Sequence, residues 1–307
     1  MSVATDHREL VDLEEEERSC RSSEDWRGLT RVLRRKARVL TWARDEHEAA
    51  LAAAGEAEQV ALALLDFDGI AWARLWRATA MAGSGRCEEA SPVLEEARER
   101  FAVTRDVGGL YCASVCRERL QRERDDPVGL WRERLRRAAY AGHRNAYERA
   151  LLGAARVGRA AFVAGELEIA DGLFALVGAP GAPAGPAAAA VLERARIAGL
   201  RGDPGRGLEL LDRLRTGHPR YDLEVLPAGL FREAAERARL LELAGGDAGA
   251  QREYVRSAGP AVVKRLDAGI DAGRHSAEWV AAARWQRERI AECLSGPAVD
   301  TGVSRAV

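Results

Sequence analysis

Residues 71–94, AWARLWRATAMAGSGRCEEASPVL, decide the fold. A helical pattern rich in Ala, Leu and Arg runs to Gly83, a tight turn follows, and a second amphipathic helical pattern begins near Cys87. Five other segments of the chain repeat this order, and almost no pattern typical of a strand accompanies them. The sequence therefore predicts an all-α protein built from helical hairpins.

The turns recur at a nearly constant interval along the chain. The small residue five past the start of each turn falls at Ala49, Ala90, Gly129, Ala170, Gly207 and Ala250. These positions lie 41, 39, 41, 37 and 43 residues apart. An interval of about 40 residues is typical of helical-repeat architectures.

Fixed residue types accompany each turn. Nine residues before the small turn position, and four after it, the residues are mostly apolar. Twelve residues before it stand Ala37, Ala78, Arg117, Gly158, Ala195 and Ala238, five of which are small. Small side chains at both sites allow paired helices to approach closely.

This pattern resembles tetratricopeptide-type (TPR-like) repeats over roughly residues 26–260. The third segment departs from it through Arg117 and Glu133, and the interval exceeds the standard length of about 34 residues. The resemblance implies a right-handed α-solenoid of about six antiparallel helix pairs with capping helices. Because the motif is structural, it implies a fold and no particular function.

The expected organisation follows from the repeats and from the Gly/Pro segment GAPGAPAGP. We expect an acidic cap helix over 1–25, repeats one to four over 26–177, a loop or hinge over 178–186, repeats five and six over 187–260, capping helices over 261–295, and a tail over 296–307.

Composition narrows the functional classes. Lys+Arg 47 against Asp+Glu 48 leaves a net charge of -1, which argues against nucleic acid as the partner. Five scattered cysteines indicate a reducing compartment rather than a disulfide framework. The acidic N-terminal run does not suit a secretory signal, and no stretch is long and apolar enough to span a membrane. A cytoplasmic location is expected.

Motifs for catalysis or cofactor binding give little support to an enzyme. Residues 61–70, ALALLDFDGI, resemble the first motif of haloacid-dehalogenase-type phosphatases, with Asp66 as nucleophile and Asp68 as acid/base. The competing interpretation is a turn between repeats in which Asp68 caps the next helix. Cys112 and Cys116 share a helix face but lack two further zinc ligands. Standard phosphate-binding loops are absent from the sequence, so we expect no cofactor, no metal and no catalysis.

The resemblance implies that the first helix of each pair lines a concave groove. One inward column there contains four arginines in six positions, and aromatic residues lie between them. Guanidinium groups bind carboxylates in bidentate pairs and aromatic side chains serve as anchors, which suits a protein or peptide partner with acidic groups. The candidate groove residues are Arg31, Arg34, Arg38, Trp72, Trp76, Tyr111, Arg156, Arg159, Arg196 and Arg239.

Two ordinary interpretations compete with the groove. The arginines could instead form salt bridges to Glu193, Glu236 and Glu242 on the same helices, and the four-residue spacing of Trp72 and Trp76 also describes a core stripe.

The main functional hypothesis is a non-catalytic scaffold that acts as an adaptor or regulator by binding a protein or peptide. One alternative is a regulatory sensor that closes on a small anionic ligand or signalling peptide. Another alternative is an enzyme or nucleic-acid binder on the same helices.

Overall fold

The computed structural model describes residues 3–43, 45–217 and 227–271, together with residues 280, 283–285, 287–288 and 291. Every regular secondary-structure element among these residues is an α-helix, which confirms the predicted all-α class. Further helical residues lie between 280 and 291, and the predicted tail over 296–307 lies outside the described residues. The helices are α1 (Val3–Ser22), α2 (Trp26–Ala43), α3 (His47–Ala63), α4 (Phe67–Gly83), α5 (Cys87–Thr104), α6 (Val107–Glu123), α7 (Pro127–Tyr140), α8 (Arg144–Val163), α9 (Leu167–Val177), α10 (Ala184–Leu200), α11 (Pro204–Gly217), α12 (Pro227–Leu243) and α13 (Gly249–Asp271).

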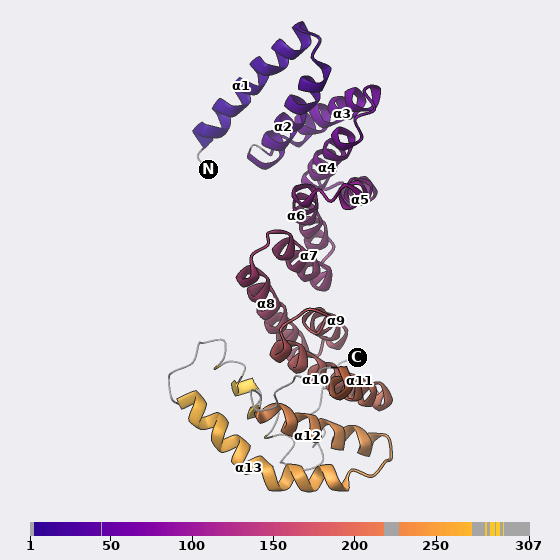
Figure 1. Cartoon of the computed structure of the whole chain (residues 1–307), viewed down its shortest axis with the longest axis vertical. Helices are drawn as coiled ribbons and strands as arrows, with labels where there is room; N and C mark the ends of the chain where they lie inside the picture. Colours follow the sequence, from indigo (N-terminus) through magenta and orange to yellow (C-terminus); the bar gives the residue numbers. More distant parts are fainter. Residues whose placement is uncertain are drawn as a thin grey trace. The chain divides into compact units, whose positions relative to one another are not determined.

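The helices pack in sequence order, as the chain trace shows (Figure 1). Each helix from α1 to α7 packs against the next, and so does each helix from α9 to α13. The helices that come first in successive hairpins also touch, as in the pairs α2 with α4, α4 with α6, and α10 with α12. The chain forms two compact units, unit 1 (Met1–Ala150) and unit 2 (Leu151–Val307).

A recurrent turn geometry explains the interval seen in the sequence. One residue in each turn within a hairpin has a positive φ, and the next residue donates its backbone N–H to a carbonyl near the end of the preceding helix. At Gly85, where φ is 80°, Arg86 N donates to Met81 O over 2.9 Å. The left-handed residues are Asp45, Gly85, Asp125, Gly165, Gly202 and Gly245, at intervals of 40, 40, 40, 37 and 43 residues.

Small residues form the crossings between helices. Ala37, Ala78, Ala195 and Ala238 are fully buried. Larger apolar side chains such as Leu94 and Leu211 fill the core beside them. The two outermost turn positions, Ala49 and Ala250, are exposed, so those two residues are not at buried crossings.

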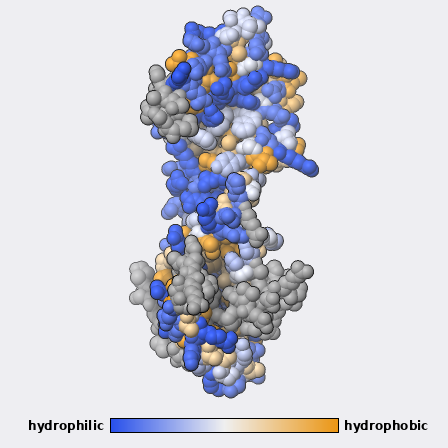
Figure 2. Space-filling model, turned by 60° about the vertical axis from the view of Figure 1, so that its left-hand side comes forward, coloured by the Kyte–Doolittle hydropathy of each residue, from blue (hydrophilic) through white to orange (hydrophobic). Residues whose placement is uncertain are grey.

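The surface shown in Figure 2 is mostly hydrophilic, with separate hydrophobic patches. Among the described helices, none combines the length and the apolar character that crossing a membrane requires.

Candidate functional site

The ten predicted groove residues divide between the two units. Six of them, from Arg31 to Tyr111, belong to unit 1, and four, from Arg156 to Arg239, belong to unit 2. Each set is therefore described within its own unit.

Three indole rings form a continuous ladder in unit 1, called here the tryptophan ladder (Trp42, Trp76 and Trp72). The Trp42 and Trp76 rings lie 5.3 Å apart at 83°, and the Trp76 and Trp72 rings lie 6.2 Å apart in a stacked pair. Trp76 is buried, at 4% exposed, so the core interpretation is correct for this ring. Trp42, at 50% exposed, carries the ladder to the surface.

The inner end of the ladder is held in place by a polar contact. Trp72 Nε1 donates a hydrogen bond of 3.0 Å to Asp106 Oδ2, and its ring lies 5.1 Å from that of Phe101. The other carboxylate oxygen of Asp106 accepts from Gly109 N over 2.9 Å and caps α6. One aspartate thus fixes both a helix start and the orientation of an indole.

Arg34 of α2, also in unit 1, carries a partly buried positive charge. Its side chain is half-buried, and within the described part of the chain its guanidinium has no hydrogen bond or ion pair. Burial lowers the pKa of Arg34, and nearby Arg31 adds to this, whereas the carboxylates of Asp66, Asp106 and Asp68 oppose it. The charges of three carboxylates therefore act on Arg34, while its guanidinium N–H donors have no hydrogen-bond acceptor in the described residues.

The remaining predicted residues of unit 1 are less suited to binding. Arg38 Nη2 already lies 2.8 Å from Glu9 Oε1 of α1. Arg31 and Tyr111 are exposed on α2 and α6, and Tyr111 belongs to neither ring pair of the ladder. Arg38 nevertheless lies near Cys112 of α6, where its charge partly offsets the rise in the thiol pKa that burial causes.

In unit 2 the salt-bridge interpretation is correct for Arg239. Its Nε lies 3.0 Å from Glu236 Oε1, and its Nη2 donates to the Arg196 carbonyl over 3.1 Å. Arg196 lies over the Phe162 ring at 5.6 Å. Of the other two glutamates, Glu193 forms an ion pair with Arg232 and also interacts electrostatically with Arg196 and Arg159, and Glu242 forms an ion pair with Arg252.

Arg156 and Arg159 differ from the two paired arginines of unit 2. Neither has an ion pair within the described residues. Arg156 is exposed, whereas Arg159 is half-buried and its pKa is lowered by burial.

The phosphatase-like segment is a helix start. Asp66 Oδ1 accepts from Gly69 N over 2.9 Å and caps α4. Asp68 instead lies 3.2 Å from Arg100 Nε. The expectation that Asp68 caps this helix is therefore wrong, because the side chain that reaches the free N–H group is that of the residue before Phe67.

The cysteine pair offers little reactivity. Cys116 is buried, and burial raises its pKa to about 11, which keeps the thiol protonated at neutral pH. Among the residues that the structure describes, no three metal-ligating side chains come together.

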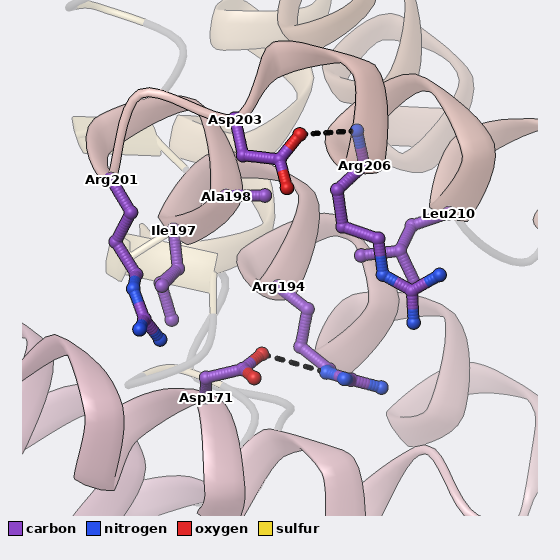
Figure 3. Close-up of a pocket in the computed structure, with 8 residues that line it drawn as sticks. All are labelled: Asp171, Arg194, Ile197, Ala198, Arg201, Asp203, Arg206 and Leu210. Atoms are coloured by element: carbon purple, nitrogen blue, oxygen red, sulfur yellow. Dashed lines mark hydrogen bonds and ion pairs between the residues drawn. The ribbon is translucent and has the colours of Figure 1, made fainter.

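A cavity of about 360 Å³ lies between α9, α10 and α11 (Figure 3). Three arginines line it, but Arg194 is bound to Asp171 at 2.8 Å and Arg206 to Glu209 at 2.9 Å. Asp203 also lines it and caps α11 by accepting from Arg206 N over 2.9 Å. Arg201 has no ion pair within the described residues.

Sequence reasoning missed two of these features. Trp42 does not fall at any of the fixed offsets that were counted from the small turn residues. It follows Arg34 by eight residues on the same helix, and this spacing could have indicated that the two side chains share a helix face. The cavity could not be found in this way, because its lining comes from three helices.

A scan of the chain against protein-family models and against curated proteins finds no match. The candidate site therefore depends on unit 1, which contains both the tryptophan ladder with its one exposed ring, Trp42, and the half-buried Arg34.

Proposed function

We propose that the chain is a TPR-like scaffold, a right-handed α-solenoid of about six antiparallel helix pairs, that binds a protein or peptide without catalysing a reaction. The observation that carries this proposal is Arg34, a half-buried guanidinium without an ion pair in the described residues, whose charge interacts with Asp106, the hydrogen-bond partner of Trp72 in the tryptophan ladder. Free cysteines scattered along the helices support a cytoplasmic location for this adaptor or regulator.

The side chains of Trp42 and Arg34 indicate the chemistry of a partner that would fit them. Trp42 offers a flat, exposed indole against which an apolar or aromatic side chain can pack. Arg34 offers a cation that gains more from a carboxylate than a fully hydrated arginine does. A peptide with an apolar anchor and an acidic residue satisfies both groups at once.

The rigidity of the ladder supports binding. Trp76 is held by packing in the core with Ala37 and Ala54, and Trp72 is held by its hydrogen bond to Asp106. Rings that are already ordered lose little conformational entropy when a partner covers them.

A peptide-display selection tests the proposal. We expect the wild-type chain to select peptides of about 12 residues that combine acidic and aromatic or aliphatic side chains. The selected peptides should bind the Arg34→Glu and Trp42→Ala variants at least about tenfold more weakly, as hot-spot substitutions do.

Arg132→Glu is the matched control, because Arg132 is an exposed arginine of α7 that has no ion pair within the described residues. This variant should bind like the wild type. Equal loss in Arg132→Glu and Arg34→Glu would show that only net charge matters. If a folded Arg34→Glu variant bound the peptides as tightly as the wild type, the peptides would not bind at Arg34 and the tryptophan ladder.

A further inference from the structure

The buried carboxylate of Glu118 in α6 holds three arginine side chains. Arg134 Nε of α7 donates to Glu118 Oε1 over 2.9 Å, and Arg137 Nη1 lies 2.8 Å from Glu118 Oε2. Arg122 Nη2, one helix turn further along α6, lies 3.4 Å from Glu118 Oε1. These four residues are called here the Glu118 cluster. Because one carboxylate balances one of the three cations, the cluster has an excess of two positive charges.

The excess charge of this cluster reaches the solvent. The Glu118 side chain is 8% exposed, whereas those of Arg122, Arg134 and Arg137 are 60%, 31% and 34% exposed. No other carboxylate pairs with these three arginines in the part of the chain that the structure describes. The two helices that carry them, α6 and α7, contain seven arginines and three glutamates. A chain with a net charge of -1 thus has a locally basic surface.

Unit 1 contains a second cluster of the same design, in which the charges balance. Glu58 of α3 lies 2.7 Å from Arg74 Nε and 2.5 Å from Arg77 Nη1 of α4. These arginines follow the buried glutamate by 16 and 19 residues, which are also the offsets of the two α7 arginines in the Glu118 cluster. Arg74 Nη1 lies 2.5 Å from Glu96 Oε2 as well, so two carboxylates meet two cations. These four residues are called here the Glu58 cluster.

The comparison shows that pairing of the helices does not need an excess of charge. Four residues after the buried glutamate, the Glu58 cluster has Leu62 where the Glu118 cluster has Arg122. The Glu58 cluster joins α3 to α4 with no net charge, so the third arginine of the Glu118 cluster adds nothing that this kind of helix contact requires. Exposed guanidinium groups around a fixed carboxylate are instead suited to binding an anion.

The arginines of the Glu118 cluster are already ordered. Glu118 holds the ends of Arg134 and Arg137, and the Arg134 guanidinium also lies 4.8 Å from the centroid of the Trp131 ring. Ordered side chains lose little conformational entropy when a ligand binds. Guanidinium groups bind phosphate oxygens in bidentate pairs, and a phosphate dianion has the charge that neutralises the excess of two.

We propose that the Glu118 cluster is a binding site for a dianionic phosphate group, free or carried by a phosphorylated side chain. Arg122, Arg134 and Arg137 contact the phosphate oxygens, and Glu118 lies beneath them and positions their guanidinium groups. The inference goes beyond the proposed function, because it uses side chains of α6 and α7 and holds whether or not Arg34 and the tryptophan ladder bind a peptide.

Inorganic phosphate is the first probe. Isothermal titration calorimetry of the full-length chain at about pH 8, where phosphate is mostly dianionic, should show one site with a Kd on the order of 0.1–1 mM. Ionic strength is held constant with NaCl, because exposed charges are screened by salt.

Variants of the two clusters test where the phosphate binds. Arg122→Gln and Arg137→Gln should each raise the Kd about tenfold, because each removes a charge-assisted hydrogen bond. Arg77→Gln is the matched control, because Arg77 has the same position in the balanced Glu58 cluster as Arg137 has in the Glu118 cluster, and its Kd should equal that of the wild type.

Glu118→Gln tests the site in the opposite direction. The substitution keeps the shape of the side chain and an oxygen acceptor for Arg134, but it removes the anion that competes with phosphate for the three cations. It should therefore lower the Kd for phosphate about tenfold.

A second probe distinguishes the two sources of the phosphate group. A peptide library with a fixed central phosphoserine is selected on the wild-type chain, and the same library without phosphate is its control. Phosphopeptides that bind at least about tenfold more tightly than inorganic phosphate would assign the group to a partner protein. If no peptide exceeds inorganic phosphate, the group is free phosphate or a small ester.

The proposal is overturned if the wild-type chain binds neither probe at concentrations up to about 10 mM. It is also overturned if Arg122→Gln and Arg137→Gln variants with wild-type helicity bind phosphate as tightly as the wild type. Equal weakening in Arg77→Gln and Arg137→Gln would overturn it too, because only net charge would then matter. If Arg137→Gln or Glu118→Gln does not fold, Arg122→Gln decides, because this side chain is the most exposed of the cluster.

Discussion

At the scale of single residues, Arg117 and Glu133 break the repeat pattern and compensate each other. Arg117 stands where the other hairpins have a small residue, and Glu133 stands at a mostly apolar position. In the structure, Arg117 Nε lies 3.3 Å from Glu133 Oε1, and Arg136 lies 2.6 Å from the same carboxylate, which is 2% exposed. A charge at one position therefore supplies the partner that the buried charge at the other requires.

This pairing predicts non-additive stability. Arg117→Ala should lower the free energy of unfolding by about 1–2 kcal/mol, because the buried Glu133 loses one of its cations. The double variant Arg117→Ala/Glu133→Leu restores the repeat pattern and should recover most of the loss. Urea unfolding of the wild type, both single variants and the double variant gives the coupling free energy. Additive losses would show that the two residues do not depend on each other.

The start of α4 gives a second comparison between neighbouring residues. Asp66→Ala should cost about 1 kcal/mol of stability, because the N–H of Gly69 loses its capping acceptor. Asp68→Ala removes an exposed ion pair with Arg100 and a carboxylate in the first turn of α4, and should cost less, about 0.5 kcal/mol. Thermal unfolding of the two variants measures the difference. A larger loss of stability from Asp68→Ala than from Asp66→Ala would show that Asp66 is not the residue that caps α4.

At the scale of helices, charge pairs between α1 and α2 accompany a small apolar contact. Glu17 lies 2.9 Å from Lys36, and Glu16 lies 3.0 Å from Arg35. Among the α1 side chains that the structure describes, Leu13 is the fully buried apolar one, packed with Val32 and Val39, and Leu10 and Cys20 are partly buried. Docking of α1 should therefore depend on charge more than the packing of α4 does.

This dependence predicts a response to pH. Burial raises the pKa of Glu17, but hydrogen bonds from Lys36 and Arg21 lower it more, so the folded pKa lies below the ordinary value of 4.5. A lowered carboxyl pKa stabilises the docked helix above pH 4.5, and this contribution is lost as the pH falls through the folded value. Amide hydrogen exchange, corrected for the effect of pH on the intrinsic exchange rate, should show that α1 loses protection at a higher pH than α4 does as acid is added.

Salt provides an independent control for the same element. About 1 M NaCl screens exposed ion pairs, so it should also loosen α1 while leaving the apolar crossings of α4 protected. Equal protection of both helices under acid and under salt would contradict an electrostatic attachment of α1.

The helical hairpins were predictable because their signals are local. A turn needs a left-handed residue and a cap nearby in the sequence, and a crossing needs a small residue at a fixed offset, so Gly85 and Ala78 were both visible in the sequence. The pairing of each arginine was not visible in this way. Arg38 pairs with Glu9 and Arg239 with Glu236, whereas Arg34 has no such pair in the described residues, and only the placement of neighbouring helices decides which case applies.

At the scale of the whole chain, packing is local, since each core cluster draws on a few helices that follow one another. Leu75 packs with Leu94 and Phe101 in unit 1, and Leu211 packs with Leu192 and Leu240 in unit 2. The division between the units falls inside α8, at residues 150 and 151. In proteins built from nearest-neighbour contacts, stability is approximately a sum of local terms.

Local packing predicts that a core cavity in one unit leaves the other unit stable. Leu75→Ala should lower the local stability of α4 to α6 by about 2–5 kcal/mol, the usual cost of truncating a buried leucine, and leave amide protection in α10 to α12 unchanged. Leu211→Ala is the matched variant in unit 2. It should lower amide protection in α10 to α12 and leave protection in α4 to α6 unchanged. Hydrogen exchange followed by mass spectrometry measures both units in one experiment. If either variant lowered protection equally in both units, the chain would unfold as one cooperative body and a sum of local terms would not describe it.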